Sequence, residues 1–216
     1  GIDVIAQNAD AYLWSNSGIY ATATAGDGSS AQAHGAYVYG YDYATARVWG
    51  DISAYASAGD GSCALARGID VIAQNGDASL EINSNVYATA FGGDGSLVIA
   101  QGANVNGYGY AYAIVDGVIE AYASTGDGIQ AQAGGIDVTA QNGDAYLYVG
   151  GHIYASAIAG TGSLAQAHGA YVTGYDDASA LVYNTIDAYA SVTTGVAQAV
   201  GITVTANNGD GYLYNE

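Results

Sequence analysis

The sequence predicts an all-β fold, and within that class a parallel β-solenoid, from three observations. A repeat of 33–34 residues runs through the whole chain, residues within it alternate with a period of two, and Gly, Asn or Asp interrupts every eight or nine residues. Alternation with a period of two is typical of strands with one buried face, and arrays of short repeats are typical of solenoids. Apolar residues do not recur at the i, i+3, i+4 spacing of a helix.

The repeat is read from two alternating segments. The segment GIDVIAQNAD begins at Gly1 and returns, with substitutions, at Gly68, Gly135 and Gly201, which are 67, 67 and 66 residues apart. A divergent copy begins halfway between these starts, as GAYVYGYD, GANVNGYG and GAYVTGYD at Gly35, Gly102 and Gly169. The chain is therefore one repeat domain over residues 1–216, with about 6.5 repeats of 33–34 residues, a 67-residue super-repeat and no evident caps.

Corner residues divide each repeat again, at about 17 residues. One set of corners is formed by aspartates: Asp10, Asp27, Asp42, Asp60, Asp77, Asp94, Asp127, Asp144, Asp176 and Asp210. A second set of breaks lies between them, at Gly18, Gly35, Gly50, Gly68, Asn85, Gly102, Gly117, Gly135, Gly151, Gly169, Asn184 and Gly201. Gly, Asn and Asp tolerate the positive φ angles of tight turns, so both sets are expected to be corners.

The residues between corners favour a thin core. In residues 19–26, Ile19, Ala21, Ala23 and Ala25 share one face, and most inward positions elsewhere are also Ala. Ala fills only a narrow space, which favours a 17-residue rung of two strands around a thin Ala-rich core. A 33-residue coil with four strands, an antiparallel stack of hairpins and a disordered chain are the alternatives.

Composition excludes several classes of protein. With Lys+Arg 2 and Asp+Glu 20, the net charge of −18 excludes a nucleic-acid partner bound through its phosphates. No apolar stretch approaches the length of a membrane span, so no membrane insertion is expected. The single cysteine, Cys63, forms no internal disulfide or thiolate metal site, and it is interpreted as a tolerated outward residue.

Stacked rungs place equivalent residues in columns on the surface. Six tyrosines, each followed by Ala-Thr or Ala-Ser or a close variant, are predicted to form an outward column: Tyr20, Tyr55, Tyr87, Tyr122, Tyr154 and Tyr189. Four glutamines are predicted to share another position, with Leu65 and Ile99 in the remaining repeats: Gln32, Gln132, Gln166 and Gln198. Such columns stabilise a sheet by ring stacking and amide ladders, and an exposed face rich in them is an association surface.

The Gly-Asp-Gly-Ser corners raise an electrostatic question. Like charges at Asp27, Asp60, Asp94 and Asp127 repel one another along the stack, and only Arg47 and Arg67 are available to offset them. Either the carboxylates are solvated or cap turn amides, or weakly bound calcium bridges them, since calcium prefers carboxylate oxygens. No other cofactor is expected.

Catalysis has no support in the sequence, so the chain is predicted not to be an enzyme. His34 and His168 occupy the same position of the repeat, just before a corner glycine, and are interpreted as solvated corner residues. No nucleophile elbow, zinc-protease motif or phosphate-binding loop is present.

The segment GIDVIAQNGDASLEI (68–82) resembles the repeats of filamentous-haemagglutinin-type secreted adhesins, which are right-handed β-helical rods at microbial surfaces. The nested 17-residue units with Tyr and Thr columns also look like bacterial ice-nucleation proteins. The Gln- and Asn-bearing repeats are similar in kind to curli-like functional amyloids and archaeal sheath proteins. These resemblances imply a microbial extracellular β-solenoid.

The function expected from these observations is structural. Uncapped ends indicate either a piece of a longer array or subunits that stack end to end through open β-edges. The leading hypothesis is an extracellular or cell-surface protein whose partner is itself, end to end and side by side, in a filament, sheath or surface layer. The alternatives are an ice-binding solenoid that uses Tyr, Thr and Ser columns, and an adhesin stalk stabilised by cations.

Overall fold

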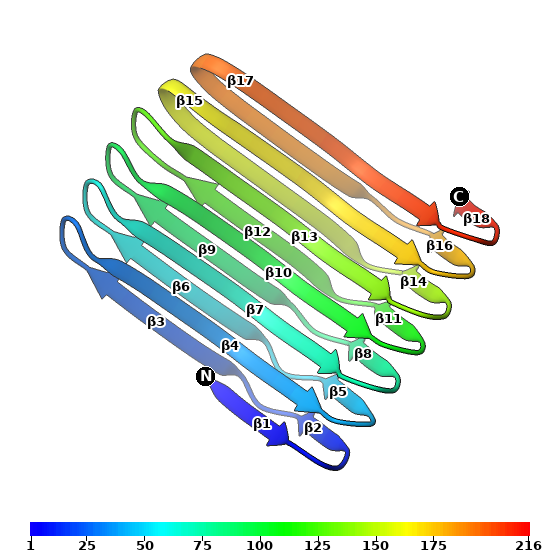
Figure 1. Ribbon diagram of the computed structural model, residues 1–216. Coiled ribbons are helices and arrows are strands. Elements are labelled where there is room, and N and C mark those ends of the chain that lie inside the picture. The colour runs from blue at the N-terminus through cyan, green and yellow to red at the C-terminus, as the bar shows by residue number, and fades with distance from the viewer.

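A computed structural model describes the whole chain, residues 1–216, as a stack of parallel coils (Figure 1). Every strand pairs in parallel with the equivalent strand of the next coil, as Val38 pairs with Val71, and no residue is helical. The stack has about six turns. The prediction of an all-β parallel β-solenoid is confirmed, and the antiparallel stack and the disordered chain are wrong. No helix long and apolar enough to cross a membrane is present.

Three kinds of strand make up each coil. The eleven-residue strands are β4 (Ser30–Gly40), β7 (Cys63–Ala73), β10 (Leu97–Gly107) and β13 (Gln130–Ala140), and β1 (Ile2–Ala6) is the second half of such a strand. The five-residue strands are β2 (Ala11–Ser15), β5 (Ala44–Val48), β8 (Ala78–Ile82), β11 (Ala111–Val115), β14 (Ala145–Val149), β16 (Ala178–Val182) and β18 (Gly211–Asn215). The seven-residue strands are β3 (Ile19–Ala25), β6 (Ile52–Ala58), β9 (Val86–Gly92) and β12 (Val118–Ser124). Two longer strands, β15 (His152–Gly174) and β17 (Ile186–Ala206), each combine a seven-residue and an eleven-residue segment.

The coil is about 33 residues long, so the favoured 17-residue rung is wrong. Strand β4 pairs with β1 and β7, and β6 pairs with β3 and β9, so partners lie three strands apart in the chain. The predicted coil was too short because half of the second set of predicted corners are not corners. Gly18, Gly50 and their equivalents lie in turns, but Gly35, Gly68, Gly102, Gly135, Gly169 and Gly201 lie inside strands.

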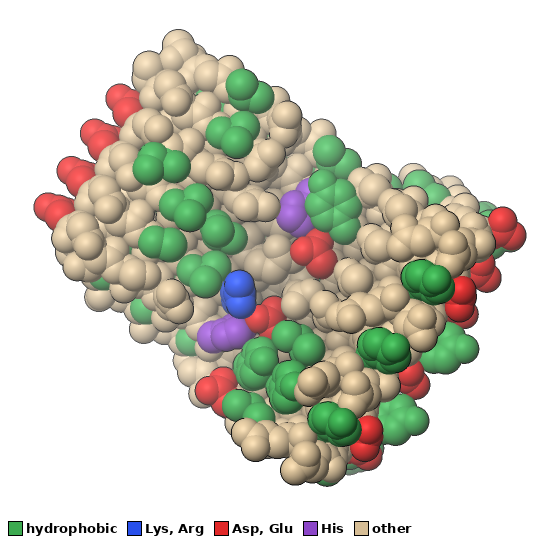
Figure 2. All heavy atoms as spheres, viewed as in Figure 1, with side chains coloured by type: hydrophobic (Ala, Val, Ile, Leu, Met, Phe, Trp, Pro, Cys, Tyr) green, Lys and Arg blue, Asp and Glu red, His purple; other side chains and the backbone are tan.

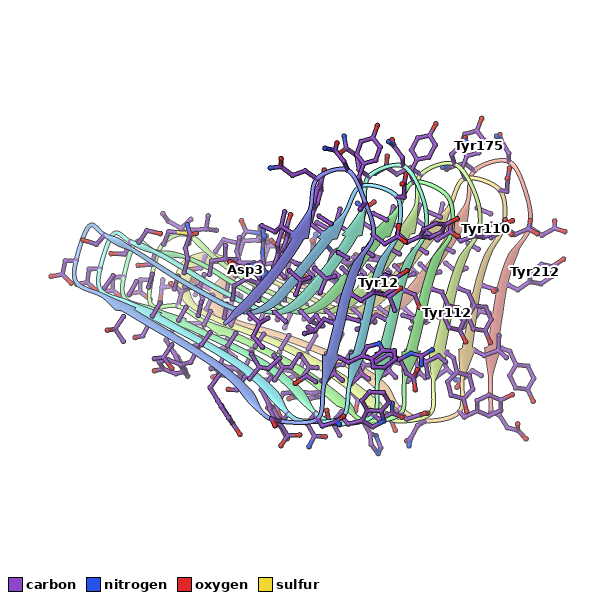
Figure 3. All side chains as sticks on the ribbon, turned by 90° about the horizontal axis from the view of Figure 1, so that it is seen from below. Asp3, Tyr12, Tyr110, Tyr112, Tyr175 and Tyr212 are labelled. Atoms are coloured by element: carbon purple, nitrogen blue, oxygen red, sulfur yellow. The ribbon has the colours of Figure 1, made fainter.

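The cross-section of the coil is a wedge, and its two halves have different cores (Figure 3). In the narrow half, the first segments of the long strands pack on the seven-residue strands around 20 buried residues, all Ala except Val98. In the wide half, the five-residue strands close the coil around 34 buried residues that include the largest core side chains, such as Leu80 and Ile82. The predicted thin Ala-rich core is therefore present in the narrow half only. Val, Ile and Leu fill the wider half, which is why a 33-residue coil has no need of bulky residues throughout.

Core residues of the wide half explain the 67-residue super-repeat. Along the five-residue strands one inward position alternates between large and small residues: Leu13, Ala46, Leu80, Ala113, Leu147, Ala180 and Leu213. The long strands alternate in phase with them, through Ile2, Ala36, Ile69, Ala103, Ile136, Ala170 and Ile202. Layers with large side chains therefore alternate with layers of small ones, which lets the large side chains interdigitate across the smaller layers.

Candidate functional site

The long strands bend at a column of buried glycines, which we call the bend glycines: Gly35, Gly68, Gly102, Gly135 and Gly169. The alternation shifts phase here, because Gly35 and Ala36 are both buried. A Cβ at Gly68 would overlap the carbonyl oxygen of Gly102 in the next coil and Cγ1 of Val86 in the core. Only glycine fits, so the repeat needs it for close packing inside a strand rather than for a corner.

Outward side chains on the two sides of the bend converge. The ring centroids of His34 and Tyr37 are 5.6 Å apart, and those of His168 and Tyr171 are 4.4 Å apart. Arg67 and Asp70, at the same two positions of the next coil, approach to 3.5 Å. The bend therefore forms a hollow that runs along the solenoid axis, with charged groups near its middle (Figure 2). Asp3 marks its position at the first coil (Figure 3).

We call this hollow the central trough. It contains a pocket of about 390 Å³ lined by Tyr37, Arg67, Asp70, Ile72, Ile99, Gln101, Asn104 and Asp137. Asp70 is almost fully buried, and its Oδ2 lies 2.8 Å from Nε2 of His34 and 3.5 Å from the guanidinium of Arg67. A buried carboxylate is costly unless it is paired, and these two partners supply the pairing.

A second histidine–aspartate pair lies further along the stack, and its Asp137 is two coils beyond Asp70. Nε2 of His168 lies 3.1 Å from Oδ1 of Asp137, and the His168 side chain is nearly buried. The interpretation of His34 and His168 as solvated corner residues is therefore wrong. Both belong to strands and approach aspartates that are more than 30 residues away in the sequence.

The grouping of Asp70, Asp137, Tyr37 and Tyr171 in one site was not predicted from the sequence. One signal was available, because the octapeptide AQAHGAYV occurs without change at residues 31–38 and 165–172. Its His and Tyr, three residues apart, converge only because the strand bends between them. Burial, and next the charge of Asp70, raise the pKa of Tyr37 above its usual value of about 10.

The six predicted tyrosines form two neighbouring columns on the seven-residue segments rather than one. Tyr20, Tyr87 and Tyr154 alternate with Ser53, Glu120 and Asp187 in one column. Tyr55, Tyr122 and Tyr189 alternate with Thr22, Thr89 and Ser156 in the next. Each ring thus has a small or acidic neighbour in the next coil, and the aromatic contacts here join Phe91 to Tyr55 and Tyr122.

Other aromatic rings gather around the wide end of the wedge. Tyr12, Tyr112 and Tyr212 share a column on the outer face of the five-residue strands (Figure 3). Tyr112 stacks on Tyr146 with ring centroids 5.1 Å apart, and Arg47 lies 6.0 Å over Trp14 while pairing with Glu81 at 3.2 Å.

The four predicted glutamines do share one position, as expected. Gln32, Gln132, Gln166 and Gln198 lie in one column with Leu65 and Ile99. Only Gln166 and Gln198 of this column take part in an amide ladder. Gln130 of the neighbouring column donates to Gln166 at 2.7 Å, and Gln166 donates to Gln198 at 2.8 Å. Half-buried Cys63 lies in the neighbouring outward column, as predicted.

The corner aspartates Asp27, Asp60, Asp94 and Asp127 form a ladder at the narrow edge of the wedge. Oδ1 of each accepts a hydrogen bond from the backbone N–H one coil further on, at 3.0 Å from Asp60 to Asp27 and 2.9 Å from Asp94 to Asp60. The glycine that precedes each aspartate in the chain makes room for the carboxylate of the aspartate one coil earlier. A Cβ at Gly93, for example, would overlap Oδ1 of Asp60. The second glycine of each turn, such as Gly61 with φ 64°, adopts the left-handed conformation.

This ladder gives the corner carboxylates a structural role. No group of three or more His, Cys, Asp or Glu side chains is arranged to hold a metal ion. The calcium sites at Asp27, Asp60, Asp94 and Asp127 therefore stay a prediction.

Comparisons with known proteins give no relative for this chain. No family model, no curated protein and no solved structure matches it. The class that the fold defines is the parallel β-solenoid repeat protein.

Proposed function

We propose that this chain is a structural protein, whose solenoids associate with one another in an extracellular or cell-surface filament, sheath or layer. One observation carries the proposal: equivalent strands of successive coils pair in parallel and in register, so a coil of a second copy can continue the stack by the same pairing. Strands β1, β2 and β3 pair on one side only, and so do β17 and β18 at the other end.

The outermost coils also expose residues of the core positions. Leu213 of β18 faces the core side and is 52% exposed, whereas its equivalents Leu80 and Leu147 are fully buried. A hollow of about 430 Å³ opens beside it, lined among others by Ile186, Ile202 and Leu213. A coil of a second copy would pair these backbone edges and bury this apolar surface.

The aromatic rings at the wide end and the outward columns support association side by side as well. The resemblance of residues 68–82 to filamentous-haemagglutinin-type repeats agrees with a rod at a cell surface. Ladders of repeated hydrogen bonds along each corner suit a rigid material.

Electron microscopy and fibre diffraction of the purified chain, with and without calcium, test the proposal. We expect uniform filaments in the micrographs and a diffraction reflection at about 4.8 Å along the filament axis. Dispersed short rods at all protein concentrations would contradict self-assembly.

Two substitutions on the outermost coil locate the contact. Leu213→Lys places a charge on the exposed core-side edge and should abolish filaments, since a buried unpaired charge is costly. Thr205→Lys, at an exposed outward position of β17 on the same outermost coil, is the control and should still assemble. Filaments that persist in Leu213→Lys would show that this edge is not the contact.

A further inference from the structure

The central trough has a length and a lining that neither the corner ladders nor the stacking of coils requires. Its floor is the column Asp70, Asn104 and Asp137 on three consecutive coils, and Tyr37 and Tyr171 occupy the same column beyond them. These two tyrosines are four coils apart, which is roughly 19 Å at the usual strand spacing. Gly134 carries no side chain, and Oε1 of Gln101 and the ring of His168 occupy the space in front of it in one wall.

Several polar groups in the trough have hydrogen-bonding capacity left. The side-chain amide of Asn104 makes no hydrogen bond within the chain, and Gln101 uses only its Nε2, which donates to the carbonyl of Ala103. The Arg67 guanidinium uses one of its nitrogens on Asp70 and is 46% exposed. Donors and acceptors are therefore mixed over the floor and one wall, next to the ring of Tyr37.

The charges of the trough narrow the class of ligand. A net charge of −18 and the two carboxylates repel polyanions. Oδ2 of Asp70 has two partners, His34 and Arg67, Oδ1 of Asp137 has His168, and no group of three or more His, Cys, Asp or Glu side chains is arranged here to hold a cation. A peptide strand would need an open backbone edge, and the trough lies on the face of a sheet whose edges are paired.

We propose that the central trough binds a stretch of a neutral, extended oligosaccharide that lies along the solenoid axis. Hydroxyl groups both donate and accept, which matches the mixed donors and acceptors of Asn104, Gln101 and Arg67. The C–H face of a sugar ring packs against an aromatic ring such as Tyr37, as other apolar groups do. The polar and aromatic groups of the floor follow one another along the axis at the strand spacing, from Tyr37 through Asp70, Asn104 and Asp137 to Tyr171, which suits a linear polymer better than a compact ligand.

Titration calorimetry with neutral hexasaccharides tests the inference on the full chain before assembly. The probes are cellohexaose, mannohexaose and the hexamer of N-acetylglucosamine, with heparin as the anionic comparison. We expect at least one neutral hexamer to bind and heparin not to bind. Absence of binding of all three at millimolar concentration, or binding of heparin in preference, overturns the inference.

Variants assign any binding to the trough. Tyr37→Ser removes the ring, and Asn104→Leu removes the free amide at nearly constant volume; each should weaken binding about tenfold or more. Tyr122→Ser is the matched control, because Tyr122 is an outward tyrosine with an aromatic neighbour on the opposite face. Equal loss in Tyr122→Ser, or no loss in both trough variants, contradicts the assignment.

The inference is independent of self-assembly, and the two can fail separately. Circular dichroism of each variant verifies that the solenoid is intact, and sedimentation velocity reports association. If Tyr37→Ser lowers association of the chain and no sugar binds, the trough is a contact between copies and the inference is wrong.

Discussion

The Gly-Asp dipeptide of the narrow corners joins neighbouring coils through a single carboxylate oxygen. Asp60 accepts from the backbone of Asp94, and Gly93 leaves the space that this oxygen occupies. The aspartate therefore contacts the next coil, and the glycine contacts the preceding one. This arrangement accounts for the conspicuous repetition of Gly-Asp better than turn formation alone.

Gly93→Ala should lower the free energy of unfolding by about 1–3 kcal/mol, because its Cβ would displace the Asp60 carboxylate. Gly26 is the matched control: it occupies the same position in the first coil, and a Cβ there meets nothing within 4 Å. Gly26→Ala should be neutral or slightly stabilising. Denaturant unfolding of both variants measures the difference, and equal effects would refute the role of the ladder.

Substitution of Asp60 separates the hydrogen bond from the charge. Asp60→Asn keeps an oxygen acceptor for the N–H of Asp94 and removes one repulsive charge, so stability should hold or rise. Asp60→Ala should cost about 1 kcal/mol, the usual worth of such a hydrogen bond.

The same pair of variants tests calcium at the corners. If calcium bridges the carboxylates, a chelator will lower the melting temperature of the native chain, and Asp60→Asn will reduce that loss. If the carboxylates act only as acceptors, the chelator will leave the melting temperature unchanged.

At the scale of elements, strands of one kind differ between alternate coils in the size of their core residues. Strands β8 and β14 carry Leu80 and Leu147 inward, and β11 between them carries Ala113. Ala113→Leu would place three leucines in succession and should destabilise the fold by about 1–3 kcal/mol through overpacking. Tyr112→Leu, on the outward side of the same strand, should change stability by less. Similar losses for both, measured by chemical unfolding, would contradict alternate layering.

Because several tyrosines on the strand faces have a raised pKa, we expect the fold to lose stability at alkaline pH. Seven of them have a raised pKa: Tyr12, Tyr37, Tyr87, Tyr112, Tyr146, Tyr212 and Tyr214. Burial is the largest cause for Tyr37, and the hydrogen bond to Asp10 is the largest for Tyr12.

A pKa raised in the folded state means that the folded chain holds the phenolic proton more tightly than the unfolded chain. This contribution to stability is complete below the unfolded pKa of about 10, and it is lost as the pH rises through the folded values. Unfolding followed by circular dichroism should therefore show stability falling only above that pH, and Tyr37→Phe should fall less steeply. A decline that begins near neutrality would have another origin.

At the scale of the whole molecule, net charge opposes the proposed assembly. Copies that each carry −18 repel one another, and salt screens this repulsion over about 10 Å at 0.1 M ionic strength. Filament formation should accelerate with added sodium chloride and as the pH approaches the pI of about 4.1. Light scattering measures the rate, and assembly that slows with salt would indicate contacts dominated by opposite charges.

The sequence by itself determined the class of the fold, the repeat lengths, the corner aspartates, the inward alanines and the shared position of the glutamines. These features are local or strictly periodic, and alternation with a period of two is the same whatever the length of the coil. The coil length was open for that reason. It depends on whether a glycine such as Gly68 lies in a turn or inside a strand, and contacts with Gly102 of the next coil and with Val86 across the core decide this.

The tertiary structure alone decided the central trough and the division of the tyrosines into two columns. His34 and Asp70 are 36 residues apart and meet only because one coil returns above the other and the long strand bends at its glycine. The repeated octapeptide AQAHGAYV marks the place in the sequence but not the contact, because the bend arises from close packing between coils. Residue types and their period therefore specified the scaffold, whereas the geometry of stacking placed the candidate site on it.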